Sequence, residues 1–341
     1  MMEYQWGDRA FGPGQQRTVD LSIVLLNWNS APLVAQCLDS IKHSGTRCSY
    51  EIVIADNAST DGSQEWLRSL ESGNLLIRCI FNPENRGFGA GNNQALPYCT
   101  GRYILFLNTD TQVLEPLDGL VAAADMLGPR CGAIGGRVLN LDHTIQYSCR
   151  DEYTLPVLLA SYILAYLGLT SRGVRRQQLW DWDHSAPRDV ATLSGCHLLI
   201  PRHVLAQVGG FDPHIFLYFE DTDLCYRIRR AGYVVRYVPT STIIHFEGGS
   251  SRQKGLTPRS LGSSINSARY FAHRYLGAWQ AATLTVAVLC AYFAMMCALA
   301  LVGLLAPKQH LREKSQQRAR LLWQVIGIML RGPAPWRERN V

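Results

Sequence analysis

The chain has 341 residues, of which 47% are hydrophobic and 18% are charged, and its formal net charge is +6. This length and composition predict one large or two smaller globular domains with a substantial core, and they exclude a disordered protein. The basic residues of the last third are neither interleaved with aromatic residues nor accompanied by zinc-knuckle spacing. This pattern favours contact with a membrane surface and argues against nucleic-acid binding.

The ten cysteines include no C-x-x-C pair, and most lie in apolar runs, as Cys79, Cys196, Cys225, Cys290 and Cys297 do. Such cysteines are typical of buried thiols in a reducing compartment. Residues 1–19 lack the layout of a signal peptide and are interpreted as a short polar lead-in. Any catalytic part is therefore expected to be cytoplasmic.

Apolar runs alternate with helical patterns over the first 130 residues. Buried strands are predicted at residues 21–26, 51–55, 75–81 and 103–107. A helix is expected to begin at Pro32, with Asn29 or Ser30 as its cap. Strand–helix–strand repeats at this spacing predict an α/β fold with a mostly parallel, Rossmann-like sheet and right-handed crossovers.

A polar cluster follows each of these four strands: NWNS, DNASTDGS, NPENRGFGAGNN and NTDT. Because ligands bind outside the carboxyl ends of strands in open α/β sheets, the four clusters together predict a nucleotide-type ligand. A turn explains any single cluster equally well, since Asn, Asp, Ser and Gly are ordinary loop residues. The glycines of residues 87–91 fit neither a dinucleotide motif nor a P-loop, and they are expected to allow close backbone approach to a ligand or a positive φ.

Two residues after strands are candidate ligands of a hard divalent cation such as Mg²⁺ or Mn²⁺. Asp110 is the third residue of the fourth cluster, and His245 follows an apolar run near the end of the predicted sheet. Carboxylates and imidazoles are suitable ligands for such ions. The alternatives are a turn or helix cap for Asp110 and a structural histidine for His245.

The middle of the chain continues with strands at residues 131–139, 191–200 and 234–238, the last ending before Pro239, and with a helix at 202–208. The apolar stretch 155–169 is too short for a comfortable membrane span. Its flanking basic residues, Arg172, Arg175 and Arg176, favour a helix in the membrane interface. A helix covering the sheet is the alternative.

An acidic stretch at residues 209–233 places Asp212, Glu220, Asp221 and Asp223 around the start of a predicted helix that stops at Gly232. Carboxylates are favoured at a helix N-terminus, and Asp223 is expected to serve that purpose. Asp221 is the candidate general base, because a base that takes a proton from a hydroxyl must be ionised.

The tail at residues 278–306 is almost uncharged and, as a helix, would be about 40 Å long. That length could cross a bilayer with tilt. Basic residues lie on both sides of it, so the positive-inside rule chooses no orientation. A bent or re-entrant membrane helix, with residues 321–330 as a second interfacial segment, is the other possibility.

Taken together, the stretches SIVLLNWNS, DNASTDGS, NRGFGAGNN, LNTDT, SGCHLLIPR, GGFDPHIFLYFEDTDLCYRIRRAGY and HFEGGS resemble the family 2 glycosyltransferases of the GT-A fold, in particular the bacterial rhamnosyltransferase-like branch. The resemblance covers about residues 20–250. It implies transfer of a sugar, with inversion, from a nucleoside-diphosphate donor to an acceptor hydroxyl. The favoured donor is dTDP-L-rhamnose, with a UDP-sugar as the other choice, and the expected acceptor is a polysaccharide or a glycan on polyprenyl diphosphate.

The resemblance also implies roles for individual residues. Asp221 would be the base, Asp110 and His245 would hold the cation, and Ser194, Gly195 and Glu220 would lie on the acceptor side. Asn108 stands where the family has the first carboxylate of its D-x-D motif, so this motif departs from the pattern. The donor would be bound by Asp56, Asn57, Asp61, Asn85, Gly87, Asn92 and Asn108.

The predicted organisation is a lead-in (1–19), a glycosyltransferase domain (20–275) with donor-binding (20–130) and acceptor or catalytic (131–275) halves, and a membrane-associated tail (276–341). We expect an enzyme of cell-envelope glycan synthesis at the cytoplasmic face of the inner membrane. The departure at Asn108 leaves open a non-catalytic nucleotide-sugar-binding scaffold. A nucleotidyltransferase ranks low, because only Arg9, Gly12, Gly14 and Arg17 precede the first strand as a partial match to a basic glycine-rich loop.

Overall fold

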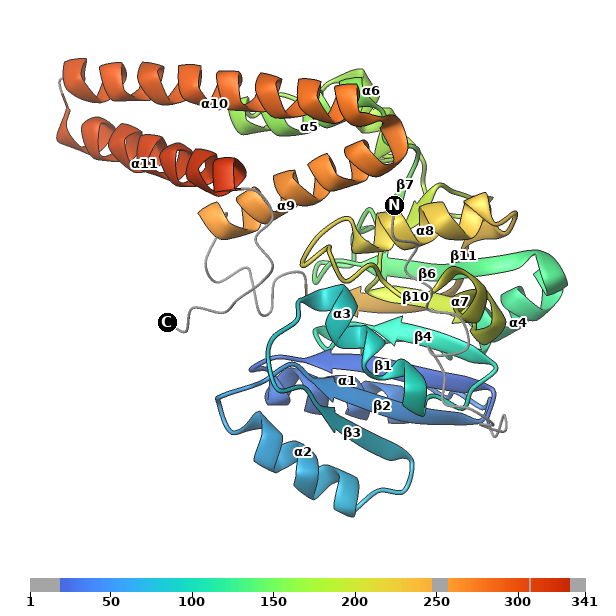
Figure 1. Cartoon of the computed structure of the whole chain (residues 1–341). Helices are drawn as coiled ribbons and strands as arrows, with labels where there is room; N and C mark the ends of the chain where they lie inside the picture. The colour runs from blue at the N-terminus through green and yellow to red at the C-terminus, as the bar shows by residue number, and fades with distance from the viewer. Residues whose placement is uncertain (1–18, 247–256, 307, 332–341) are drawn as a thin grey trace.

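The computed structural model describes residues 19–246, 257–306 and 308–331. The lead-in up to residue 18, including Arg9 to Arg17, lies outside the described residues, as does the end of the HFEGGS motif from Glu247 to Ser250. The described chain forms one large sheet with helices on both faces and a layer of helices beside it (Figure 1).

The N-terminal half of the sheet is parallel, as predicted. Its strands lie in the order β3-β2-β1-β4. They are β1 (Leu21–Asn27), β2 (Tyr50–Asp56), β3 (Ile77–Phe81) and β4 (Tyr103–Leu107). The connecting helices are α1 (Ala31–His43), α2 (Ser63–Ser72) and α3 (Phe88–Asn93). Since parallel neighbours need crossovers, the carboxyl ends of these strands all meet at one edge.

The other half of the sheet is mixed, so the predicted mostly parallel sheet also contains antiparallel strands. The order continues β10-β6-β11-β5, and β8 pairs with β11. These strands are β5 (Thr111–Val113), β6 (Cys131–Leu139), β8 (Arg188–Asp189), β10 (His197–Pro201) and β11 (Val234–His245). β10 is antiparallel to β4 because it starts at the carboxyl edge, where His197 lies opposite Leu107. This reversal brings the residues just before β10 to the edge where the ligand is expected.

Several local predictions differ from the structure. The strand expected at 191–200 is divided into β9 (Thr192–Leu193), which pairs with β7 (Cys149–Arg150), and β10. β11 does not stop before Pro239, because a register shift between Tyr237 and Thr242 accommodates the proline. Ser30 precedes α1 but makes no side-chain cap, since its hydroxyl donates to Asn27 Oδ1.

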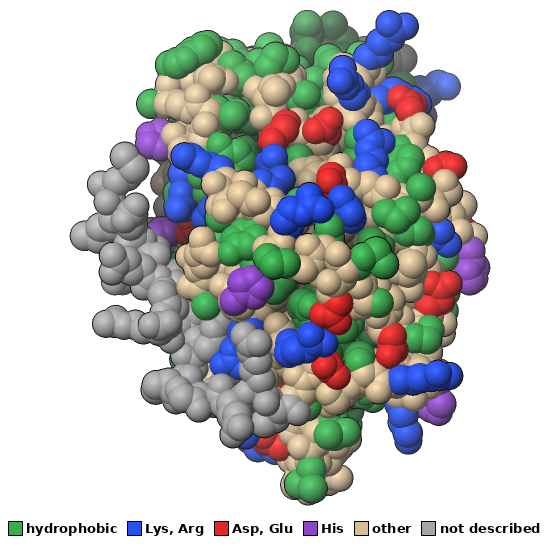
Figure 2. All heavy atoms as spheres, turned by 90° about the vertical axis from the view of Figure 1, so that its right-hand side faces the viewer, with side chains coloured by type: hydrophobic (Ala, Val, Ile, Leu, Met, Phe, Trp, Pro, Cys, Tyr) green, Lys and Arg blue, Asp and Glu red, His purple; other side chains and the backbone are tan. Residues whose placement is uncertain are grey.

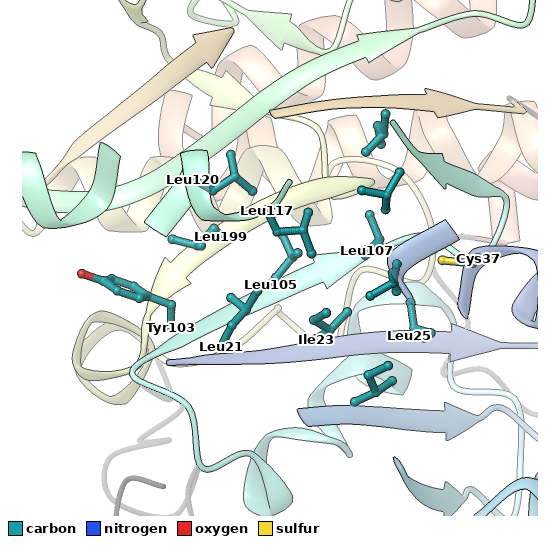
Figure 3. Close-up of a cluster of buried hydrophobic side chains, with 14 of the residues drawn as sticks. Leu21, Ile23, Leu25, Cys37, Tyr103, Leu105, Leu107, Leu117, Leu120 and Leu199 are labelled. Carbon is teal, nitrogen blue, oxygen red and sulfur yellow. The ribbon is translucent and has the colours of Figure 1, made fainter. Parts of the chain in front are cut away.

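The sheet separates two hydrophobic cores. On one face, Leu21, Ile23 and Leu25 of β1 pack with α1 and with α4 (Asp118–Leu127) (Figure 3). On the other face, alternate residues such as Val24 pack with α7 (Arg202–Val208) and α8 (Glu220–Arg230). This alternation follows from the period of two along a strand. The helices predicted at 202–208 and after residue 219 are confirmed as α7 and α8.

A third core lies between helices beside the sheet. Its main helices are α5 (Leu155–Ile163), α9 (Pro258–Phe271), α10 (Ala278–Leu305) and α11 (Gln309–Arg331). α5 packs on α10, where Tyr292 donates its hydroxyl to the Tyr162 carbonyl at 3.1 Å. The third core therefore crosses the boundary predicted at residue 275. The prediction of buried cysteines is wrong for Cys290 and Cys297, which α10 exposes.

Candidate active site

Asp221 lies in the first turn of α8 and is held by backbone N–H groups. Its Oδ2 accepts from Gly195 N at 3.3 Å, and its Oδ1 accepts from Thr222 N at 2.7 Å. The side chain is 15% exposed, so part of the carboxylate remains accessible. The two residues before α8, Tyr218 and Phe219, have φ values of 66° and 70°. Such non-glycine conformations are costly, and they cluster at functional sites.

The turn before β10 joins Asp221 to the Asn108–Asp110 triplet. Gly195 donates to Asp221, and the carbonyl of Cys196 accepts from Asn108 N at 3.1 Å. The predicted acceptor-side residues Ser194 and Gly195 therefore lie beside the candidate base. The candidate base and the candidate metal ligands share one edge of the sheet.

The two predicted metal ligands face each other. Asp110 Oδ1 lies 3.2 Å from His245 Nε2, and Asn108 Nδ2 lies 3.2 Å from the same nitrogen. Neighbouring ligands around a six-coordinate Mg²⁺ or Mn²⁺ are about 3 Å apart, so this spacing suits one ion. A rotated Asn108 amide would present its oxygen instead of its nitrogen. Within residues 19–246, 257–306 and 308–331, no three His, Cys, Asp or Glu side chains form such a group, so the site relies on Asn108.

Gln146 is a residue of this site that the sequence did not indicate. Its Oε1 accepts from His245 Nδ1 at 2.7 Å. An Nδ1–H donor leaves the lone pair on Nε2, which is the form that binds a metal. The donor set of Asp110, His245 and Asn108 therefore fits a divalent cation.

Arg150 was also missed. Its Nη1 lies 4.0 Å from Asp221 Oδ2, and its side chain is 26% exposed. Residues 146, 148 and 150 all contact the site. Gln146 and Arg150 do so through their side chains, and Ser148 does so through its carbonyl, which accepts from Ser194 N at 2.8 Å. Alternate residues of an extended segment share a face, which explains this arrangement. No motif marks the segment, so only the fold reveals it.

Glu220, which the resemblance places on the acceptor side, is buried next to Asp221. It is 7% exposed, and its Oε2 has no hydrogen-bond partner among the described residues. Burial, together with the charge of Asp221, raises the pKa of Glu220 to about 8. The carboxyl is therefore neutral at pH 7, because an ionised form would be unsolvated and next to a like charge. An acceptor contact by Glu220 therefore stays a prediction.

Asp223 and Asp212 do not face this site. Asp223 is fully buried, and it accepts from Arg227 Nε at 2.8 Å and from the Tyr275 hydroxyl at 2.5 Å. Asp212 accepts from the Tyr270 hydroxyl at 2.9 Å and pairs with Arg274. Both carboxylates thus bind α9 and the turn after it. The prediction that Asp223 merely stabilises the helix dipole is incomplete.

Asp56 and Asn57 organise the predicted donor side. Asp56 is fully buried, and its oxygens accept from Asn27 Nδ2 at 2.8 Å, Ser59 N at 2.9 Å and Gln64 Nε2 at 2.9 Å. In this conformation it exposes no atom to a ligand. Asn57 Nδ2 donates to Asn85 Oδ1 at 3.0 Å and to the Gly87 carbonyl at 3.1 Å. These two side chains therefore hold the loops that follow β2 and β3 together.

The glycine-rich loop packs closely against the acidic stretch. Gly87 has a φ of +81°, and a Cβ there would lie 2.3 Å from the Phe216 carbonyl oxygen. Asn92 is buried and donates to the Phe88 carbonyl at 2.9 Å. Of the two predicted roles for these glycines, the positive φ is confirmed at Gly87. Asp61 is exposed and caps Ser63 N at 3.0 Å. Donor contacts by these residues remain predictions.

Residues 22–181 match the family described as Glycosyl transferase family 2. The N-acetylglucosaminyl-diphospho-decaprenol L-rhamnosyltransferase of Mycobacterium tuberculosis is 27% identical over 281 residues, which cover 76% of this chain and 87% of that protein. Rhamnosyltransferase WbbL of Escherichia coli is 27% identical over 178 residues, which cover 49% of this chain and 63% of that protein.

Solved structures show the same fold. Mannosyltransferase PcManGT from Pyrobaculum calidifontis, in complex with GDP-Man and Mn²⁺, has a TM-score of 0.53 and 19% identity, and the match covers 96% of this chain and 93% of the other. GalNAc-T7 with UDP, GalNAc and Mn²⁺ has a TM-score of 0.52 and 18% identity, covering 75% and 50%. The GT-A fold is therefore confirmed. Residues 22–181 thus match glycosyl transferase family 2, and the chain is a glycosyltransferase similar to bacterial rhamnosyltransferases.

Proposed function

We propose that the protein is an inverting, membrane-associated glycosyltransferase of cell-envelope glycan synthesis. One observation carries this proposal. A partly exposed carboxylate, Asp221, and a facing pair, Asp110 and His245, lie on one sheet edge and are joined through the turn before β10. Single displacement needs these two functions: a base for the incoming hydroxyl and positive charge near the departing diphosphate.

In the proposed reaction, Asp221 takes the proton of the acceptor hydroxyl as its oxygen attacks the anomeric carbon. The bond from that carbon to the diphosphate breaks, and the nucleoside diphosphate leaves with the electron pair. Gly195 N and Thr222 N hold the Asp221 carboxylate in place. Arg150, beside it, adds positive charge to this part of the site. The other carboxylates near Asp221 are not free to act as a nucleophile, since Asp110 pairs with His245 and Glu220 is buried, which supports inversion over a double displacement.

Asp110, His245 and Asn108 would hold a divalent cation, Mg²⁺ or Mn²⁺, which when bound neutralises charge on the diphosphate. Gln146 keeps His245 in the form that suits this role. The Mn²⁺ in both related structures supports a divalent cation for this chain. These structures contain different nucleotides, so they leave the nucleotide of this chain to be tested.

The favoured donor is dTDP-L-rhamnose, since two relatives carry the name rhamnosyltransferase. The name of the mycobacterial relative specifies a diphospho-decaprenol acceptor, which supports an acceptor on polyprenyl diphosphate here. One helix, Ala278–Leu305, is long and apolar enough for a membrane. Nucleotide sugars and reduced thiols are both cytoplasmic, so we place the site on the cytoplasmic face of the inner membrane.

Replacing Asp221 with Asn tests the proposal. Transfer should fall by about 10²- to 10⁴-fold, the usual contribution of a general base, while nucleotide binding measured by calorimetry stays unchanged. Asp142→Asn is the matched control, because Asp142 is exposed and lies outside the site. Unchanged turnover in Asp221→Asn would remove Asp221 from the mechanism. A thermal-shift screen of nucleotide sugars with Mg²⁺ or Mn²⁺ would identify the donor.

A non-catalytic, membrane-bound nucleotide-sugar-binding scaffold is the second candidate. Asn108 in place of a carboxylate favours it, because the cation would have fewer charged ligands. Donor binding with neither hydrolysis nor transfer, with Mg²⁺ or Mn²⁺ present, would decide for the scaffold. Transfer by the unmodified protein would decide against it.

A further inference from the structure

The helix α10 presents an unpartnered apolar stripe to solvent. Its exposed members lie seven, seven, eight and three residues apart along the helix, so they share one face. Their exposed fractions are 68% for Trp279, 59% for Val286, 56% for Phe293, 56% for Leu301 and 73% for Leu304. Soluble proteins rarely expose an apolar stripe of this length, so the stripe indicates contact with lipid or with another protein.

The inner half of α10 is held by the rest of the protein. Leu284, Val288 and Tyr292 are fully buried in the third core, and Tyr292 is hydrogen-bonded to the end of α5. Residues 293–305 continue α10 past Tyr292, and Figure 1 shows the far end of α10 beside α11. At 1.5 Å per residue this part is about 20 Å long. A bilayer core is about 30 Å thick, so the projecting part is too short to cross it.

The projecting part of α10 is accompanied by a charged helix. α11 turns back along it, since Gly303 packs against Ser315 and Arg269 Nη1 donates to the Met329 carbonyl at 2.9 Å. A crossing α10 would take the outer half of α11 into hydrocarbon, where charged side chains are costly. That outer half exposes Arg312, Glu313, Lys314, Arg318 and Arg320.

Further apolar and basic residues lie beside α10. Leu167 and Leu169 are more than half exposed, and Arg172 and Arg176 of α6 (Arg172–Gln177) are exposed nearby. α5 and α6 lie next to α10 at the top of Figure 1. Figure 2 shows hydrophobic side chains along the upper edge of the molecule, with Lys and Arg side chains close to them. Apolar residues flanked by cations are typical of surfaces that lie in the interface of an anionic bilayer.

We propose that α10 and α11 form a one-sided hairpin that lies in the interface of an anionic bilayer and does not cross it. The projecting length, the charged outer half of α11 and the cations of α6 all support this arrangement over a span. The hairpin rests on the proposed function in one respect, because it specifies how the enzyme reaches an acceptor carried by the membrane. Both ends of the hairpin and the candidate active site are then on the same side of the membrane.

Cysteine labelling tests the one-sided arrangement in the full-length protein. The background variant carries Cys290→Ala and Cys297→Ala, which removes the two exposed native thiols. Lys308→Cys then reports the hairpin tip, and Ser72→Cys, an exposed position in α2, reports the side of the catalytic domain. A membrane-impermeant maleimide is added to inverted and to right-side-out membrane vesicles, and labelling of the background is subtracted.

We expect both cysteines to be labelled at least ten times faster in the same vesicle orientation. Labelling of Lys308→Cys from the side opposite to Ser72→Cys would show a crossing helix and overturn the proposal. The result does not depend on activity. Failure of the proposed function would instead appear as a lack of transfer by enzyme in detergent.

Vesicle flotation tests whether the exposed apolar stripe of α10 contacts lipid. Purified full-length protein should bind vesicles containing phosphatidylglycerol at least tenfold better than vesicles of phosphatidylcholine alone. Phe293→Glu combined with Leu301→Glu should reduce binding at least tenfold, with nucleotide binding unchanged as evidence of folding. Leu75→Glu is the matched control, since Leu75 is fully exposed on the sheet side. Equal binding to both vesicle types, or binding that survives the double change, would contradict a lipid occupant and favour a protein partner.

Discussion

Replacing Glu220 with Gln should change how stability depends on pH. Glu220 is buried beside Asp221, and one of its oxygens has no partner among the described residues. Burial and the charge of Asp221 raise its pKa to about 8, whereas its ordinary value is 4.5. Glutamine has nearly the same shape as the neutral carboxyl but cannot ionise. The substitution therefore removes the titration and leaves the packing almost unchanged.

The sign of the effect follows from proton binding. Between pH 4.5 and about 8, folded Glu220 retains a proton that the unfolded chain releases. The free energy of unfolding therefore falls as pH rises through this window, by about 1.4 kcal/mol for each pH unit. Over the whole window the loss is on the order of 5 kcal/mol. Glu220→Gln should not show this loss.

Urea unfolding of both proteins at pH 5, 6.5 and 8 measures the effect. The variant should gain stability relative to the unmodified protein as pH rises, and most of the gain should be present at pH 8. A stability difference that stays the same at all three pH values would show that Glu220 is ionised in the folded protein. It would refute the reasoning from burial.

Three further substitutions test other contacts. Gln146→Leu leaves His245 Nδ1 without its acceptor, and Mn²⁺ affinity measured by calorimetry should fall about 10- to 100-fold; an unchanged affinity would mean that Gln146 does not orient His245. Gly87→Ala places a Cβ 2.3 Å from the Phe216 carbonyl oxygen at a φ of +81°, and should cost roughly 2–5 kcal/mol in thermal unfolding. Gly62→Ala, with a φ of +88° but open space around it, should cost only about 1–2 kcal/mol, and equal losses would disprove the clash. Asp223→Asn weakens a buried carboxylate that pairs with Arg227 and Tyr275, and should lower the free energy of unfolding by about 3–5 kcal/mol in urea, whereas the exposed Asp142→Asn should not; equal effects would contradict a structural role.

The parallel strands and the position of Asp110 and His245 at one sheet edge were predictable because their signals are local. Runs of apolar residues gave four strands close to their observed bounds, and strand ends placed Asp110 and His245 at the sheet edge. That edge is shared because parallel strands run the same way. The reversal of β10 was not predictable, because an apolar run reads alike in either direction.

Contacts within the site depend on pairings between distant segments. Gln146 reaches His245 across 99 residues of sequence, from an irregular segment without a motif. Likewise, a polar loop residue such as Asp56 has the same local pattern whether it contacts a ligand or a neighbouring loop. The structure shows that Asp56 and Gly87 contact protein. Hydrogen-bond partners, rather than residue type, show which contacts such a residue makes within the protein.

The acidic stretch connects the candidate active site to the helices beside the sheet. Asp221 faces the site, while Asp212 and Asp223 hold Tyr270, Arg274 and Tyr275, which immediately precede α10. Because the Asp223 contacts are buried, α8 and the start of α10 are held together firmly. If the α10–α11 hairpin lies in the bilayer interface as proposed, the height of the candidate base above the membrane is fixed by these contacts. A lipid-linked acceptor would then meet Asp221 at a set distance from the bilayer, so weakening Asp223 should impair transfer to such an acceptor more than transfer to a soluble one.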